Sequence, residues 1–471
     1  MPAPVPRLMV HLDTELPRTL AVGRGTCLFV SGTCHTPRDR VSDARLLLDG
    51  HGHPRVPIGA PIETKDRAEG FVAFVAVPPV DRPRSAALEL EARLADGERV
   101  RQPLAVVELV PHLAPGAPPV SIPATGGPPV AICMATFDPE PRLLERQIAS
   151  IREQTHGAWV CLISDDCSAE ARFRDLRSMT ARDPRFVLSR SAAKLGFYRN
   201  FERALAMVPA GAAFVALADQ DDRWYPEKLA ELLAHRDDAE LVYSDMRVVD
   251  ASGRASSQTF WQGRRNNYTN LASLLLANTV TGAASLFRRE LLDLVLPFPP
   301  QVGRSFHDQW IASVALATGR IAYVDRPLYD YVQHGGASLG HAAALRDYEP
   351  RRLLKWSDPR GTARELAVHG RRSYLNNVCR IALAAHALQT RTAGAIGRPK
   401  ARAVRRAVRL GRPPEPYAWL ALRSLRRLAG RNETMGIELS LLAAIAWRRL
   451  AAARARRRAA TRRRELAGRE M

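Results

Sequence analysis

From residue 130 onward, short apolar runs alternate with amphipathic segments, and this alternation restricts the possible folds more than any other feature of the sequence. The runs PVAICMAT and AAFVALADQDD are typical of buried strands, and the segment after the first run places Leu144, Ile148 and Ile151 on one helical face. Repeated strand–helix units predict an α/β fold with a mostly parallel sheet and helices on both of its faces. Ligands of such sheets bind at the carboxyl ends of the strands.

The chain has 471 residues, which suggests roughly three domains at about 150 residues each. Residues 1–113 contain short apolar runs separated by glycine and proline, which predicts a small β-sandwich accessory domain. The Pro/Gly-rich segment 114–129 predicts a semi-rigid linker. The α/β domain is expected over residues 130–340. Residues 341–471 are rich in Ala, Leu and Arg and predict a helical region.

The basic charge of the chain lies at its C-terminal end. Residues 341–471 carry 31 Lys/Arg and 9 Asp/Glu, whereas residues 1–340 carry 38 and 39. Such asymmetry indicates an anionic partner. The arginines lie beside an amphipathic stretch, IELSLLAAIAW (437–447), which favours an interfacial helix on an anionic membrane surface. Nucleic acid is not expected as a partner, because no aromatic residues are interleaved with the arginine tract. A solvated tail is the simpler alternative.

The expected location is the cytoplasm, peripheral at the inner face of the cell membrane. The six cysteines form no paired Cys-x-x-Cys pattern, which favours a reducing compartment. The first residues lack the basic start and long apolar core of a signal peptide. No window offers about 18 uninterrupted apolar residues, so no spanning helix is expected.

An acidic turn follows one of the buried runs. Asp219, Asp221 and Asp222 come directly after the apolar residues of FVALA, at the predicted carboxyl end of a strand. Two carboxylates spaced two residues apart on an extended segment can face the same cation. Carboxylate oxygens suit Mg²⁺ or Mn²⁺, and Mg²⁺ commonly shares its ligands with substrate phosphates. The alternative is a solvated loop between a strand and a helix.

A second acidic pair, Asp165 and Asp166, ends the run WVCLIS. Two acidic strand ends in one sheet indicate a site for a nucleotide and its metal, because a carboxylate can accept hydrogen bonds from ribose hydroxyls or a base N–H. Alternatively, Asp166 or Ser168 caps the next helix.

Five segments together resemble the family 2 glycosyltransferases with a GT-A fold, in their order and spacing as well as in their residues. They are VAICMATFDPEPRLLERQIASIREQTHGAWVCLISDDCS, KLGFYRNFERAL, FVALADQDDRWYPEKL, TVTGAASLFRREL and HDQWIASVALATGRIAYVDRPLYDYVQHGGAS. The resemblance covers residues 129–340. The Asp-Gln-Asp-Asp form is most similar to rhamnosyltransferase-like members, which build bacterial surface polysaccharides. Two positions differ from the family: Asp138 stands where Asn is usual, and Cys167 where Gly is usual.

The resemblance implies roles for residues on the nucleotide side of the site. Thr136 would border the nucleobase, Asp165 and Asp166 would hold the base and ribose, and Arg199 would approach the nucleotide. Asp219 would bind the ribose or the metal.

The resemblance also implies the metal and the base. Asp221 would bind the metal, His334 would complete the metal or diphosphate site, and Asp308 would be the catalytic base. Gly282 could let the backbone approach the donor sugar or could form a turn. The simpler alternatives are that Asp308 caps its helix and that His334 is a surface residue.

The expected function is therefore an inverting, metal-dependent hexosyltransferase. Its donor would be dTDP-rhamnose or a UDP-sugar, and its acceptor a hydroxyl of a cell-surface polysaccharide or lipid-linked glycan. The alternatives are a polyprenyl-phosphate sugar synthase, a nucleotidyltransferase, and a non-catalytic protein that binds sugar nucleotides or polysaccharides. A nucleotidyltransferase would be favoured by a Gly-rich phosphate loop near the first strand, and TFDPEPR is not one.

Overall fold

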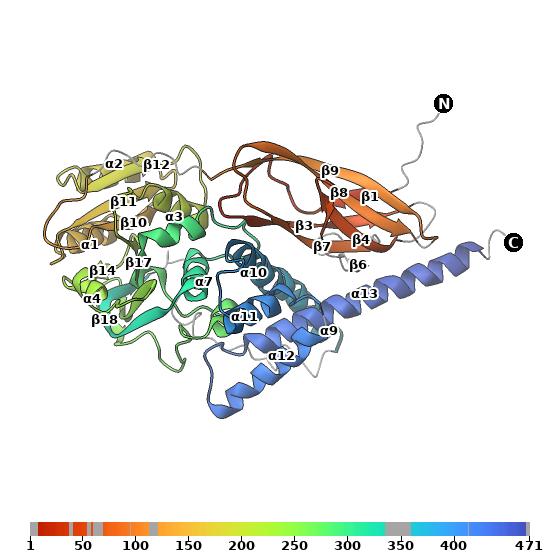
Figure 1. The fold of residues 1–471 in the computed structure, drawn as a ribbon. Helices are drawn as coiled ribbons and strands as arrows, with labels where there is room; N and C mark the ends of the chain where they lie inside the picture. The colour runs from red at the N-terminus through yellow and green to blue at the C-terminus, as the bar shows by residue number, and fades with distance from the viewer. Residues whose placement is uncertain are drawn as a thin grey trace.

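The structure is a computed structural model. It describes residues 8–36, 41–53, 58–59, 69–94, 96–112, 121–334, 359–412 and 414–467. Figure 1 shows three regions: a β-region at the N-terminus, an α/β region in the middle of the chain, and a group of C-terminal helices that contacts both. The first half of the predicted linker, up to residue 120, lies outside the described residues.

The N-terminal region is a sandwich of two sheets. Their strand orders are β1-β3-β7-β6 and β2-β9-β8-β4-β5, and among these strands only the β2–β9 pair is parallel. Leu28 and Val75 from the first sheet share a buried core with Leu88 and Val107 from the second. The strands are β1 (Met9–Leu12), β2 (Thr19–Ala21), β3 (Thr26–His35), β4 (Val41–Leu48), β5 (His51–Gly52), β6 (Ile58–Gly59), β7 (Glu69–Val77), β8 (Arg84–Leu94) and β9 (Arg99–Val110).

The central region confirms the predicted α/β fold and refines it, because its sheet is mixed. The order is β12-β11-β10-β13-β17-β15-β18-β14, with β16 beside β15. The four strands from β12 to β13 are parallel, but β17 is antiparallel to both neighbours. The strands are β10 (Val130–Thr136), β11 (Trp159–Asp165), β12 (Phe186–Arg190), β13 (Phe214–Ala218), β14 (Arg223–Trp224), β15 (Leu241–Asp250), β16 (Ala255–Ser257), β17 (Ser285–Arg288) and β18 (Ile321–Gln333).

Local sequence explains where the helices of this region begin. In α1 the Glu140 side chain accepts a hydrogen bond from the Leu143 N–H, and Pro141 occupies the first turn. The expected apolar face of this helix, which includes Leu144 and Ile148, is buried. The helices are α1 (Pro141–Arg152), α2 (Glu170–Thr180), α3 (Phe197–Ala206), α4 (Lys228–Ala234), α5 (Leu271–Leu276), α6 (Leu292–Val295), α7 (His307–Thr318) and the 3₁₀ turns η1 (Gly282–Ala284) and η2 (Arg289–Leu291).

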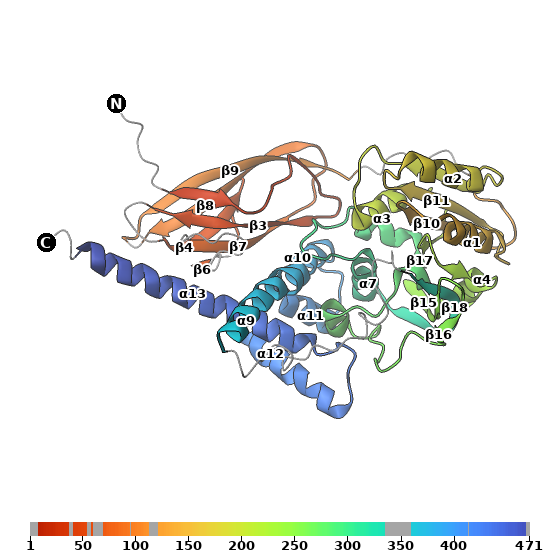
Figure 2. The ribbon, with the colours of Figure 1, turned by 180° about the vertical axis from the view of Figure 1, so that it is seen from behind.

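The C-terminal helices join the other two regions. Arg391 is buried and donates hydrogen bonds to the carbonyls of Gly25 in the sandwich and of Leu294, Val295 and Pro297 in the α/β region. These helices are α9 (Pro359–Ser373), the π-helical turn η4 (Tyr374–Cys379), α10 (Arg380–Arg391), α11 (Arg398–Val408), α12 (Glu415–Ser424), the 3₁₀ turn η5 (Leu425–Ala429) and α13 (Ile437–Ala467). Figure 2 shows α13 leaving this group as a long helix that passes beside the sandwich.

The structure corrects the expectation of an interfacial helix at 437–447. This stretch forms the start of α13, and its side chains Leu441, Ala444 and Ile445 are buried in the core, at most 2% exposed. The apolar stripe is already covered by protein, since α13 packs on α9 and α12. It is therefore not available to a membrane. Within the part of the chain that the structure describes, no helix is long and apolar enough to span a bilayer.

Candidate functional site

The carboxyl ends of three parallel strands meet at one edge of the sheet, as expected. Thr136 at the end of β10 lies in register with Asp165 at the end of β11. On the other side of β10, Met134 pairs with Ala218, so Asp219 leaves β13 at the same edge. The two acidic strand ends thus flank the end of β10.

The acidic turn after β13 is joined to the end of β18. The Asp221 carboxylate lies 2.7 Å from Nε2 of His334, the residue that follows β18. Both side chains remain about one fifth exposed, at 21% and 20%, so a ligand can reach them. The fold therefore brings together two of the residues that the resemblance assigns to a metal, although they are more than one hundred positions apart in the chain.

The third aspartate of the turn points into the protein. Asp222 is fully buried, and one of its oxygens accepts a hydrogen bond from the Val332 N–H at 3.3 Å. Its other oxygen has no hydrogen-bond partner among the described residues. Burial raises the pKa of Asp222 well above its usual value, and the neighbouring Asp219 and Asp221 add to this shift. The charge of Lys228 opposes it.

Lys228 is a residue of this site that the sequence analysis missed. It lies in the first turn of α4, is fully buried, and donates a hydrogen bond to the Ala283 carbonyl. Its ammonium group lies 3.8 Å from the centre of the Trp224 ring and 4.3 Å from that of Tyr329, which is cation–π geometry. Burial lowers the pKa of Lys228, whereas Asp222 and Asp219 raise it. The only sequence signal was the acidic turn itself, which needs a nearby cation.

Asp308 lies in the first turn of α7, close enough for its charge to act on Asp219. Its carboxylate accepts a hydrogen bond from the Gln309 N–H at 2.6 Å, and the Gly282 N–H and the Asn278 side chain also stabilise its charged form. Gly282 fits closely here, because a Cβ at this position would lie 2.8 Å from Nε2 of His307 and 3.4 Å from the Cβ of Asp308. The close approach of η1 to α7 therefore requires glycine at position 282.

Charge repulsion couples Asp308 to the acidic turn. Burial, followed by the charges of Asp221 and Asp308, raises the pKa of Asp219 to about 7. Burial raises the pKa of Asp308 to about 6, against the lowering effect of its hydrogen bonds and of Arg380. The neighbouring His307 adds no positive charge, because burial lowers its pKa to about 3. Asp219 and Asp308 thus share a buried region in which their ionised forms repel each other, and the charge of Lys228 opposes this effect at Asp219.

Asp165 and Asp166, by contrast, are occupied by bonds within the chain. Asp165 accepts hydrogen bonds from the backbone N–H and hydroxyl of Ser168 and, at 3.3 Å, from the Thr136 hydroxyl. Asp166 accepts from the N–H groups of Leu195 and Gly196, which precede α3. Both carboxyls are at most 2% exposed. Asp166 thus anchors the loop before α3, and it does not cap α2.

The structure does not bring Arg199 to the acidic turn. Its guanidinium is held by Glu202 and by the carbonyls of Phe298 and Pro299. Arg203, one turn later on α3, lies under the strand ends and donates to Ser164 Oγ and to the Ser189 carbonyl. The charges of Asp165 and Asp166 act on Arg203. The predicted role of Arg199 would therefore require a change in its side-chain position.

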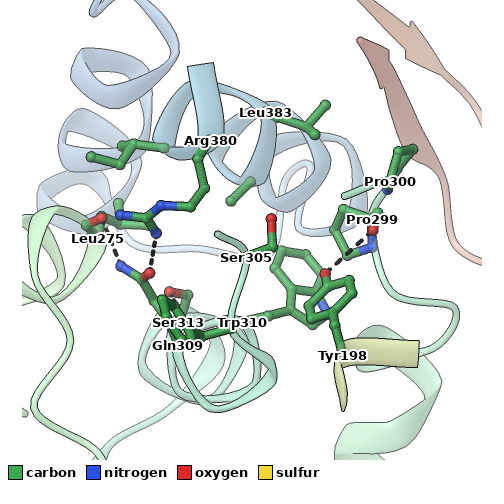
Figure 3. A pocket seen from close by; sticks show the side chains of 13 residues that line it. Tyr198, Leu275, Pro299, Pro300, Ser305, Gln309, Trp310, Ser313, Arg380 and Leu383 are labelled. Carbon is green, nitrogen blue, oxygen red and sulfur yellow. Dashed lines mark hydrogen bonds between the residues drawn. The ribbon is translucent and has the colours of Figure 1, made fainter. Parts of the chain in front are cut away.

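The C-terminal helices pack against α7, and Figure 3 shows Arg380 of α10 beside Gln309. Arg380 at the start of α10 donates a hydrogen bond to the Gln309 side chain, which in turn donates to the carbonyls of Leu274 and Leu275 at 3.1 and 3.0 Å. A small cavity lies between α7, α10 and the loop at 299–306, and Tyr198 and Trp310 are among its lining residues. It does not include the acidic turn. We regard it as a packing defect at the seam of two regions.

Among the residues that the structure describes, no three His, Cys, Asp or Glu side chains are grouped as a complete metal site. The residues present nevertheless fit a divalent ion that shares its ligands with a substrate, since Asp221 and His334 offer an oxygen and a nitrogen 2.7 Å apart. The charges of Asp221 and Asp308 close to Asp219 also favour a cation.

Comparison with known proteins gives the class of this domain. Residues 131–296 match the model of glycosyl transferase family 2. The match includes both acidic strand ends and Gly282, but ends before Asp308 and His334. It covers less than half of the chain. Residues 131–296 are therefore similar to glycosyl transferase family 2.

Individual relatives match only in part. An uncharacterized protein of Sinorhizobium fredii is 30% identical over 137 residues, which are 28% of this chain and 15% of that protein. An uncharacterized glycosyltransferase of Nostoc sp. is 28% identical over 213 residues, 43% of this chain and 64% of that protein. The chain spans less than two thirds of either relative. A solved structure of S. aureus TarS with UDP-GlcNAc is similar at a TM-score of 0.40 and 16% identity, covering 68% of this chain and 92% of that one.

Proposed function

We propose that the protein is an inverting, metal-dependent glycosyltransferase of family 2 with a GT-A fold. It would transfer a hexosyl group from a nucleotide-diphosphate sugar to a hydroxyl of a cell-surface polysaccharide or of a lipid-linked glycan. dTDP-rhamnose and UDP-sugars are the proposed donors, on the resemblance of the Asp-Gln-Asp-Asp motif to rhamnosyltransferase-like members.

One observation carries this proposal: Asp219, at the carboxyl edge of the sheet, feels the charges of both Asp221 and Asp308, and Asp221 lies 2.7 Å from His334. Burial raises the pKa of Asp219 to about 7, and the charges of Asp221 and Asp308 add to this shift. A bound cation would relieve the charge repulsion. Asp221 and His334 would hold this ion, Mg²⁺ or Mn²⁺. When bound, the ion would supply positive charge to the diphosphate of the donor.

Asp308 would act on the acceptor. A carboxylate whose pKa is raised to about 6 is still ionised at neutral pH and is a stronger base than an exposed aspartate. It would take the proton of the acceptor hydroxyl as the oxygen attacks the anomeric carbon. The bond from that carbon to the diphosphate oxygen breaks, and the diphosphate leaves with the electron pair. A single displacement of this kind inverts the anomeric centre.

The backbone around Asp308 keeps it ready for this role. The N–H groups of Gln309 and Gly282 and the side chain of Asn278 fix the carboxylate and stabilise its charged form. Asp165 and Asp166 would contribute mainly by shaping the loops that surround the nucleotide, since their own oxygens are already bonded. Thr136 would lie at the border of the base pocket.

Calorimetric titration with UDP, dTDP and GDP, each with Mn²⁺, Mg²⁺ or EDTA, tests the proposal. We expect one nucleotide to bind only with metal, and we expect Asp221→Ala to abolish this binding. Asp175→Ala is a matched control, because Asp175 is an exposed aspartate on α2 of the same domain. Binding that is equally strong in EDTA would exclude the metal-dependent mechanism. Metal-dependent binding without turnover on any acceptor would favour a binding protein.

A further inference from the structure

Three leucines stand exposed where α12 runs into η5. Leu422, Leu425 and Leu428 are 68%, 56% and 86% exposed. Their spacing of three residues places them along one side of the helix and of the 3₁₀ turn that continues it. We call these three residues the leucine corner. Solvent-facing leucines grouped in this way indicate a surface that is covered by a partner or a lipid.

The surroundings of the corner are strongly basic. Residues 398–431 contain 11 Lys/Arg, and Glu415 is their only acidic residue. On α11 the residues Arg398, Arg402 and Arg405 are exposed, at the spacing of one helical face, and so is Arg409, which follows the helix. Arg427 and Arg431 are exposed beside the leucines themselves. Apolar side chains surrounded by arginines match the boundary of an anionic bilayer, where leucines enter the acyl layer and arginines meet the headgroup phosphates.

The position of the corner also fits a membrane contact. Figures 1 and 2 show the blue segment with α12 reaching the lower edge of the molecule, on the side away from strands β8 and β9 of the sandwich. The chain turns sharply after η5, with Gly430 in the left-handed region at φ +69°. The helix therefore ends in an exposed turn.

Side-chain hydrogen bonds connect the corner to the proposed base. Asn432, just after the corner, bonds to the Gly263 carbonyl and accepts from the Arg265 N–H. Between these residues Arg264 is buried and donates to the carbonyls of Glu433 and, at 3.0 Å, of Asn278. The Asn278 side chain in turn stabilises the charged form of Asp308. Arg264 thus bonds directly both to the segment after the corner and to the segment that supports the base.

We propose that the leucine corner docks this protein on an anionic lipid surface. The leucines enter the bilayer, the neighbouring arginines bind lipid phosphates, and the Asp308 side of the site receives its acceptor from the same surface. The acceptor is then a glycan carried on a lipid. This last part rests on the proposed function, whereas the docking itself does not. The buried start of α13 plays no part in it.

Vesicle flotation tests the docking. The full chain is mixed with phosphatidylcholine vesicles that contain or lack phosphatidylglycerol. We expect flotation only with the anionic lipid, and a loss of about tenfold or more in the bound fraction when all three leucines are changed to serine. Val106→Ser is the matched control, since Val106 in the sandwich is also 68% exposed. Flotation of the triple variant at the wild-type level would overturn the proposal.

A second pair of variants separates local from overall charge. Arg427→Glu with Arg431→Glu should weaken flotation several-fold more than Arg82→Glu with Arg93→Glu, which makes the same charge change at exposed positions of the sandwich. Equal losses would mean that only the net charge of the chain matters. A second copy of the chain could cover the leucine corner in place of lipid, and size-exclusion chromatography checks this. If the wild-type chain is a dimer and the triple serine variant is a monomer, the corner is an interface between two copies.

Nucleotide titration of the triple serine variant separates this proposal from the proposed function. Unchanged nucleotide binding with lost flotation is the expected result. If no nucleotide binds to the wild-type chain while flotation still depends on the leucines, the docking surface stands and the transferase assignment fails. If the docking also presents the acceptor, the triple variant should have a higher KM for a lipid-linked acceptor in vesicles than the Val106→Ser control. Its KM for the donor should be unchanged.

Discussion

Two acidic strand ends lie at the same edge of one sheet, and they differ in what surrounds their carboxylates. At the end of β11, Asp165 and Asp166 accept hydrogen bonds from Ser168, Leu195 and Gly196 and are at most 2% exposed. After β13, Asp219 is buried close to the charges of Asp221 and Asp308, and Asp221 contacts His334. The carboxylates of the first pair are stabilised by hydrogen bonds, whereas the second pair is the one that we propose to be stabilised by a bound cation.

This difference shows that acidic residues at a strand end do not by themselves identify ligands. Repulsion and burial raise the pKa of Asp219 to about 7, which is a cost to the folded state at neutral pH. Chains keep such a cost mainly at functional sites. The next three predictions test whether the two strand ends really divide the structural and chemical roles.

The largest effect on turnover is expected from a substitution of Asp308, which lies close to the acidic turn. Asp308→Asn keeps the shape of the side chain but removes the base, so turnover should fall by about 10² to 10⁴-fold. Nucleotide binding should remain within a factor of about two, since Asp308 acts on the acceptor. Initial rates and calorimetry on the same preparation check this. Asp293→Asn, at a side chain that is 57% exposed, is the control. Turnover near the wild-type level would exclude Asp308 as the base.

The next effect contrasts the two strand ends in stability. Asp166→Ala leaves the N–H groups of Leu195 and Gly196 without their acceptor, which should lower the free energy of unfolding by about 1 to 3 kcal/mol. Asp219→Asn should instead raise the free energy of unfolding at pH 8. A folded pKa of about 7 lies above the unfolded value, so the ionised Asp219 destabilises the fold as pH rises. Urea unfolding without metal measures both. If Asp166→Ala and Asp219→Asn were equally destabilising, the two strand ends would not differ in their contribution to stability.

A smaller effect concerns pH. Burial raises the pKa of Asp308 to about 6. The proposed base would act only when it is deprotonated. Turnover should therefore fall about tenfold per pH unit below 6 and be level above 7. Arg380→Gln should move this acidic limb of the pH–rate profile to higher pH, because the Arg380 charge lowers the pKa of Asp308. A general loss of stability would lower the rate at every pH without moving the limb. A limb that stays in place would mean that Arg380 has no influence on the base.

The sequence was sufficient to predict an α/β sheet and its carboxyl edge. Local periodicity determines these features, and parallel strands carry their ends to a common edge. The antiparallel β17 was not predicted, since its direction depends on the path of the chain and not on the pattern of its apolar residues.

Three features were missed for related reasons. Lys228 looks like a surface lysine in a helix, and only the tertiary fold places it among Trp224, Tyr329 and Asp222. Arg199 and Arg203 are spaced alike on α3, and the loop at Phe298 decides which of them reaches the strand ends. An amphipathic stretch such as 437–447 has the same pattern whether a bilayer or another helix covers it.

The smallest predicted effect concerns a residue between the two strand ends. Cys167 adopts φ +60°, in the left-handed region that favours glycine, and glycine is what the resemblance leads us to expect there. Asp138 is also left-handed, at φ +39°, but its carboxylate accepts a hydrogen bond from the Ala169 N–H at 2.7 Å and so compensates in part. Cys167→Gly should therefore raise the free energy of unfolding by about 0.5 to 1 kcal/mol, whereas Asp138→Gly should not. Thermal unfolding of the two variants makes the comparison. If Cys167→Gly were destabilising, the thiol would contribute more through its contacts near Ala192 than the backbone strain costs.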